Sequence, residues 1–161
     1  MNLTIRKMAV EDVSAVVDLD QRSFSLPWPE RSFRFELTDN PASRCWVADR
    51  DGKVVGMIVV WLIVDEAHVA TIATHPEYRR QGIAKRLLAH ALRQMIQDGA
   101  RSSFLEVRES NIAAQEMYRK FGYEVAGRRR RYYRDNDEDA ILMNLERLDA
   151  ERLTLDKEEQ T

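Results

Sequence analysis

Residues 78–88 read YRRQGIAKRLL and connect an apolar run to a long amphipathic pattern. The apolar run, residues 70–74, predicts a strand, and Gly82 marks the start of a helix. Unpaired backbone N–H groups and the positive end of the helix dipole meet at such a start, which favours phosphate binding. Gly82 lets a ligand approach the backbone, and Arg79 and Arg80 add positive charge.

The spacing of this loop differs from both common nucleotide loops. It lacks the Gly-Lys-Ser/Thr end of a P-loop and the spaced glycines of a dinucleotide fingerprint. Residues 79–84 instead fit the pattern R/Q-x-x-G-x-G/A. An ordinary helix start with solvated basic side chains fits the same short pattern, so the loop alone does not determine the function.

Length and composition indicate one globular domain. The chain has 161 residues, and its net charge of −2 argues against a protein that mainly coats nucleic acid. We predict a domain over residues 1–146 and a charged tail over residues 147–161, either a surface helix or a frayed end. The single cysteine, Cys45, is expected to be a buried apolar residue in a protein of the reducing cytoplasm.

No targeting or membrane segment is expected. The N-terminus lacks the apolar core of a signal peptide. The longest apolar run, residues 54–64, has 11 residues, whereas a bilayer-spanning helix needs about 20.

Hydrophobic periodicity and turn residues predict the order β-α-α-β-β-β-α-β-α-β-β, which makes one mixed α/β sheet. The predicted strands are residues 3–6, 44–48, 53–64, 66–74, 104–108, 123–126 and 140–145, and the predicted helices are 9–22, 30–37, 83–96 and 112–121. Pro27 and Pro29 break the chain between the first two helices. Phe24 and Trp28 in that loop either fasten the helices to the sheet or line a pocket.

Glu106 is the most unusual residue of the pattern. A carboxylate between Leu105 and Val107 either points to solvent or lies in a cleft, because burying it unpaired is costly. Tyr118 follows twelve residues later on a predicted helix, where it is either a core aromatic or a functional phenol. No metal site is predicted, because the three histidines, His68, His75 and His90, fall on different elements without ligand spacing. His75 could instead touch a cofactor.

Three motifs together resemble the GNAT superfamily of acetyl-coenzyme A-dependent N-acetyltransferases over residues 3–145. They are the loop at residues 79–84, the run LEVRESN at 105–111 with Tyr118 after it, and Tyr132-Tyr133 before EDA at 138–140. Within the superfamily they are similar to the bacterial ribosomal-protein alanine N-acetyltransferases and the archaeal and eukaryotic protein N-terminal acetyltransferases.

The resemblance implies a fold and a cosubstrate. The fold is a mixed, mostly antiparallel sheet of about seven strands flanked by about four helices, with a splay between the fourth and fifth strands. Acetyl-CoA would lie in that splay, its pyrophosphate on the loop and its pantetheine arm along the fourth strand. The implied cofactor-binding residues are Ile72, Ala73, Thr74, Arg79, Arg80, Gln81, Gly82, Ile83, Ala84, Lys85 and Asn111.

The resemblance also implies roles in acyl transfer. Glu106 would accept the proton of the amine, directly or through a water, and Tyr118 would donate to the departing thiolate. The backbone N–H of Ala73 or Thr74 would stabilise the oxyanion. The implied substrate-binding residues are Phe24, Leu26, Pro27, Trp28, Tyr132 and Tyr133.

The expected reaction is acetylation of the N-terminal amine of a protein, with a ribosomal protein beginning with alanine as the expected partner. An α-amine has a pKa of about 7.7–8.0 and lysine about 10.4, so an α-amine needs only a modest base. The alternatives are acetylation of lysine or of a small amine, the latter needing a deep acidic pocket, and a non-catalytic CoA-binding regulatory module. Residues 128–131 are four arginines, either a solvated strand or an attraction for an acidic partner. Direct contact with nucleic acid or membrane is not expected.

Overall fold

Seven strands form one sheet in the computed structural model, which describes residues 2–153. The strands stand in the order β1-β2-β3-β4-β5-β7-β6, and only β4 and β5 pair in parallel. Their bounds are β1 Leu3–Lys7, β2 Ser43–Arg50, β3 Lys53–Ile63, β4 Glu66–Thr74, β5 Ser102–Arg108, β6 Glu124–Arg129 and β7 Ala140–Leu145. The mixed, mostly antiparallel sheet predicted from the sequence is therefore confirmed.

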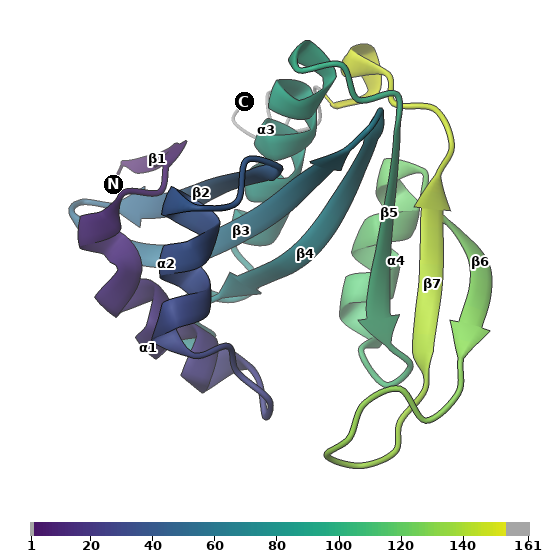
Figure 1. Ribbon diagram of the computed structural model, residues 1–161, viewed down its shortest axis with the longest axis horizontal. Coiled ribbons are helices and arrows are strands. Elements are labelled where there is room, and N and C mark those ends of the chain that lie inside the picture. Colours follow the sequence, from purple (N-terminus) through teal and green to yellow (C-terminus); the bar gives the residue numbers. More distant parts are fainter. Residues whose placement is uncertain (1, 154–161) are drawn as a thin grey trace.

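Four α-helices cover the sheet from two sides (Figure 1). Their bounds are α1 Val13–Ser23, α2 Glu30–Thr38, α3 Ile83–Gln97 and α4 Ile112–Phe121. Helices α1 and α2 bury Val16, Leu19 and Phe33 against Met57 and Val59 of β3. Helices α3 and α4 lie over the opposite face, where Leu88 and Tyr118 share a core with Leu105.

The sheet opens between β4 and β5, as Figure 1 shows. The two strands pair only from Glu66 with Ser102 to Val69 with Leu105. Both strands nevertheless continue, β4 to Thr74 beside β3 and β5 to Arg108 beside β7. One edge of β4 after Val69 is thus unpaired with β5, which confirms the expected splay between the fourth and fifth strands.

The elements occur in the predicted order, but several ends differ: β2 extends to Arg50 instead of residue 48, β5 begins at Ser102 instead of residue 104, and the start of the first helix and the end of β6 also differ. The first helix begins as a 3₁₀ turn, Val10–Asp12, in which the Asp12 N–H donates to the Ala9 carbonyl at 2.9 Å. The Asp12 carboxylate in turn accepts the Ala9 N–H at 2.7 Å and binds Arg6 at 2.8 Å. Strand β6 reaches Arg129 instead of residue 126, because a register shift between Val125 and Gly127 lets its pairing with β7 continue.

The chain after β7 packs back on the domain as far as residue 153. The Leu148 N–H donates to the Arg101 carbonyl at 2.8 Å, and Leu153 is buried at the end of a short 3₁₀ helix, Ala150–Leu153. The remainder of the predicted tail, residues 154–161, lies outside the described residues. Among residues 2–153, no helix combines the length and the apolar character needed to cross a membrane.

Candidate active site

The start of α3 has a backbone geometry that favours anion binding. Gly82 is the N-cap residue in the left-handed conformation, with φ 76°, and it offers no side chain to cap the first amides. Arg80, two residues earlier, is also left-handed, with φ 64°. Backbone N–H groups that converge in such a turn form a concave site for phosphate, at the positive end of the helix dipole.

Neighbouring elements fix this loop against the sheet. Tyr78 lies under the cations of Arg50 and Lys53, at 5.6 and 5.1 Å from its ring centroid. His75 is buried, and its Nδ1 accepts the Glu77 N–H at 3.1 Å. Since this nitrogen is used inside the loop, the structure gives His75 a role in loop geometry.

The unpaired edge of β4 contains the predicted pantetheine-binding residues Ile72, Ala73 and Thr74. Ala73 is buried, and the Thr74 hydroxyl is buried without a hydrogen-bond partner among the described residues. A chain of amides laid along this edge would find strand-like partners, as an added strand does. These residues therefore fit the arm of acetyl-CoA.

Glu106 projects from the face of β5 opposite to the buried side chains of Leu105 and Val107. Its Oε1 lies 3.4 Å from Arg129 Nε, and its side chain is 19% exposed. Burial and a hydrogen bond to Glu106 raise the pKa of the Tyr132 phenol. Glu106 is thus a shielded carboxylate with polar neighbours at the end of β6 and in the loop that follows it.

Tyr118 lies on the other face of β5, in the core formed by α3 and α4. Only 4% of it is exposed, and its ring meets Tyr123 edge-on at 5.6 Å. Burial raises the pKa of Tyr118 far above its usual value. Glu106 and Tyr118 therefore lie on opposite faces of β5, and Glu106 directly follows Leu105, the last residue of β5 that pairs with β4.

Asn111 caps α4, because its Oδ1 accepts the Ala114 N–H at 3.2 Å. Its side-chain oxygen is therefore already used within the chain. The amide Nδ2 is the group that a bound cofactor could use.

The predicted substrate-binding residues lie on two loops, one between α1 and α2 and the other between β6 and β7. Phe24, Leu26 and Tyr132 are 36%, 50% and 46% exposed. Trp28 is half-buried against Phe33, with ring centroids 5.2 Å apart, and its backbone N–H donates to Oδ2 of Asp20 at 2.7 Å. Trp28 thus fastens the loop, whereas Phe24 and Leu26 face outward. The remaining two residues are Pro27, which is exposed, and Tyr133, which is partly buried.

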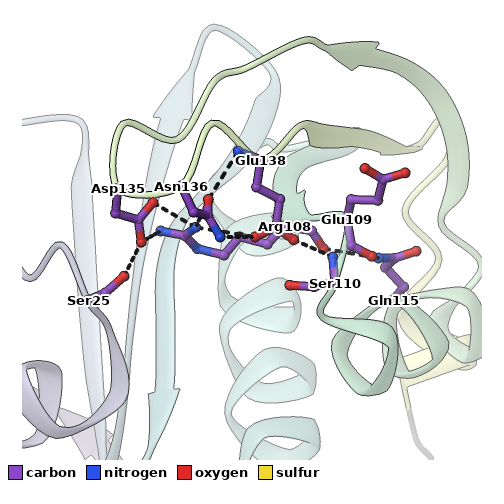
Figure 2. Close-up of polar contacts among 8 residues, drawn as sticks. All are labelled: Ser25, Arg108, Glu109, Ser110, Gln115, Asp135, Asn136 and Glu138. Carbon is purple, nitrogen blue, oxygen red and sulfur yellow. Dashed lines mark hydrogen bonds and ion pairs between the residues drawn. The ribbon is translucent and has the colours of Figure 1, made fainter.

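Sequence reasoning missed several polar partners at this site. Arg129 as the partner of Glu106 was not predicted, nor was the role of Ser25, Arg108 and Asp135, whose contacts Figure 2 shows. Of the four arginines at residues 128–131, Arg128 forms ion pairs with Asp139 at 2.7 Å and with Glu109 at 2.8 Å.

Two further expectations concern cysteine and metals. Cys45 is buried, and burial raises its pKa to about 11, as suits a core residue rather than a nucleophile. Among residues 2–153, no three acidic, histidine or cysteine side chains form a possible metal site.

Comparison with known proteins agrees with this geometry. The model of the acetyltransferase (GNAT) family matches residues 13–123. A provisionally named ribosomal protein bS18-alanine N-acetyltransferase of Bacillus subtilis (strain 168) is 40% identical, covering 86% of this chain and 92% of the relative. The ribosomal protein bS18-alanine N-acetyltransferase of Escherichia coli (strain K12) is 34% identical, covering 88% and 96%. The crystal structure of the ribosomal-protein-S18-alanine N-acetyltransferase from Escherichia coli superposes with a TM-score of 0.83 at 32% identity, covering 92% of this chain and 96% of that one. This chain belongs to the GNAT acetyltransferase family.

Proposed function

We propose that this protein is an acetyl-CoA-dependent N-alpha-acetyltransferase that acetylates the N-terminal amine of a protein, most directly a ribosomal protein beginning with alanine. The observation that carries the proposal is the similarity to the Escherichia coli relative over 88% of this chain and 96% of that protein. At this coverage, the similarity includes the loop before α3, strands β4 and β5, and both loops that contain the predicted substrate-binding residues. A ribosomal-protein substrate would place the enzyme in the cytoplasm.

Residues on the α3 side of the gap would hold acetyl-CoA. The amides of the turn from Arg79 to Lys85 would bind its pyrophosphate, and the free edge of β4 at residues 72–74 would pair with its amides. When bound there, acetyl-CoA supplies the thioester that the incoming amine attacks.

Glu106 on the other side would take the proton from the amine, directly or through one water. Its partner Arg129 has a side chain that is 58% exposed, so it can swing into solvent when a substrate amine arrives. Because an α-amine has a pKa of about 7.7–8.0, a large share of it is already neutral near pH 7.5. The carboxylate therefore needs to accept the proton only as the new bond forms.

Tyr118 would donate a proton, or a hydrogen bond, toward the leaving sulfur from the α4 side. Since burial raises the pKa of Tyr118, its hydroxyl stays protonated at neutral pH. The Ala73 or Thr74 N–H would stabilise the charge that develops on the carbonyl oxygen.

The test is acetylation of matched peptides. Incubation with acetyl-CoA and a peptide that begins with alanine should release free thiol and add one acetyl group at the α-amine, as located by mass spectrometry. The same peptide with a blocked α-amine and an internal lysine should react far more slowly. Equal rates for the two peptides would contradict the proposal. A peptide library with varied first two residues would then define the specificity.

A further inference from the structure

A hydrogen bond directly joins the two loops that contain the predicted substrate-binding residues. Ser25, in the loop between α1 and α2, donates a hydrogen bond from its Oγ to Oδ2 of Asp135, in the loop between β6 and β7. The two residues are 110 positions apart in the sequence. Figure 2 shows this contact on one side of the Asp135 carboxylate and Arg108 on the other.

Arg108 holds the same carboxylate through both of its terminal nitrogens. Nη1 donates to Oδ1 of Asp135 and Nη2 to Oδ2, each at 3.0 Å. The two side chains are 22% and 21% exposed, so the pair is partly shielded from water. A bidentate arginine–carboxylate pair fixes orientation as well as distance.

The backbone of Arg108 is itself fixed. Arg108 ends β5, and its carbonyl accepts from Nε2 of the buried Gln115 on α4 at 3.0 Å. The chain of contacts therefore runs from α4 through the end of β5 to the loop after β6, and then to the loop after α1 (Figure 2).

The guanidinium of Arg108 also contacts Tyr133, one of the predicted substrate-binding residues. Its Cζ lies 4.0 Å from the ring centroid of Tyr133, whose N–H donates to the Glu138 carbonyl at 3.1 Å. The adjacent Tyr132 lies near Glu106, whose carboxylate contributes to raising the pKa of the Tyr132 phenol. Displacing Arg108 would thus disturb the loop that meets the proposed base.

We propose that Ser25, Asp135 and Arg108 form a loop clasp that closes the two loops beside Glu106 and thereby selects the acceptor, with Arg108 as its positioning residue. This inference rests on the proposed function. A fixed separation of the loops admits a slender, extended chain end that begins with a small residue. A bulky first residue requires the Ser25–Asp135 contact to break, and so it reacts more slowly.

Hydrogen exchange tests whether the clasp holds the loops together, independently of activity. In Ser25→Ala, amides of residues 24–29 and 130–139 should exchange faster than in the wild type. In the control Ser23→Ala, which loses only a local bond to the Leu19 carbonyl, they should not. Unchanged exchange in Ser25→Ala would overturn the clasp.

Kinetics test what the clasp does. Ser25→Ala should raise the peptide KM about fivefold, the size expected for one net hydrogen bond, and leave the KM for acetyl-CoA unchanged. It should also narrow the difference in kcat/KM between peptides beginning with alanine and with leucine. Arg108→Lys keeps the charge but loses the bidentate hydrogen bonds, so it should also raise the peptide KM and narrow the difference in kcat/KM. The control Arg44→Lys, at the Arg44–Asp98 pair, should change neither quantity.

A double-mutant cycle separates the clasp from two independent effects. If Ser25 acts through Asp135, the combination of Ser25→Ala with Asp135→Ala should match Asp135→Ala alone in peptide kcat/KM. Additive losses of peptide kcat/KM in the double variant would contradict the clasp but would leave the proposed acetyltransferase activity unaffected. Failure of the proposed function looks different, because the wild type would then acetylate no peptide α-amine.

Discussion

The imidazole of His68 stacks on Phe104, with ring centroids 4.2 Å apart and 21° between the ring planes. The two residues pair across β4 and β5, one position before the last pair, Val69 with Leu105, after which the strands separate. Trp61 meets the other side of His68 edge-on at 5.2 Å. A titratable ring is thus packed between aromatic rings where the two strands begin to separate.

This packing predicts a pH-dependent stability. Burial lowers the pKa of His68, Glu106 and Glu66 act to raise it, and Arg129 acts to lower it. The folded protein therefore binds this proton less readily than the unfolded chain, whose histidine pKa is about 6.5. The stabilisation is complete above the unfolded pKa and declines as the pH falls below it.

His68→Phe keeps an aromatic ring in the stack and removes the titration. Urea unfolding between about pH 7.5 and pH 5.5 should show a smaller loss of unfolding free energy in the variant than in the wild type. Parallel pH profiles for the two proteins would show that His68 has no part in the acid sensitivity.

Gly56 allows α3 to pack closely on the sheet. A Cβ at this position would lie 2.9 Å from Ile83 Cγ2 and also 2.9 Å from Leu87 Cδ1. Gly56→Ala should therefore push back the first turns of α3, cost about 1–3 kcal/mol of unfolding free energy and raise the KM for acetyl-CoA. Gly127→Ala is the matched control, since its nearest atom, Leu142 Cδ1, lies at 3.4 Å. Equal stability of the two variants would refute this account of Gly56.

The two glycines at the ends of α3 separate backbone strain from ligand binding. Gly82 begins the helix with φ 76°, and Gly99 follows its end with φ 103°. Alanine at either site should cost about 1–2 kcal/mol of unfolding free energy, because a Cβ disfavours the left-handed conformation. Only Gly82→Ala should also raise the KM for acetyl-CoA, measured by thiol release at saturating peptide. A similar rise in Gly99→Ala would mean that destabilisation alone explains the effect.

Local patterns explain why much of the fold was predictable. The start of α3 at Gly82 and the helix stops at Gly99 and Gly122 depend on left-handed backbone, which glycine supplies at little cost. The alternation of β5 correctly separated Glu106 from Leu105 and Val107, because neighbouring residues of a strand face opposite sides.

The polar partners at the site depend on geometry that no local pattern contains. Glu106 is opposite Leu142, which in turn is opposite Gly127, so the approach of Arg129 depends on the register shift in β6. The prediction ended that strand at residue 126 and could not place Arg129. The contact between Ser25 and Asp135 joins surface loops far apart in the chain, and neither residue type is unusual in a loop.

Tyr118 and Tyr123 provide the sharpest test of the proposed acid. Both phenols are buried, both have pKa values raised by burial, and their rings are 5.6 Å apart. They differ in their partners, because the Tyr123 hydroxyl lies 2.7 Å from Ser103 Oγ deep in the core. Tyr118 belongs to the proposed reaction, whereas Tyr123 belongs to the packing alone.

The two phenylalanine variants should therefore diverge. Tyr118→Phe should lower kcat by about a hundredfold or more, the usual range for losing a proton donor, and leave the peptide KM unchanged. The loss should be the same across neutral pH, because burial keeps the Tyr118 hydroxyl protonated there. Tyr123→Phe leaves Ser103 without its phenol partner and should lower the unfolding free energy by about 1–3 kcal/mol while kcat stays near the wild-type value. If both variants lose stability and neither loses kcat, Tyr118 is a core aromatic, and the leaving thiolate must take its proton from another group.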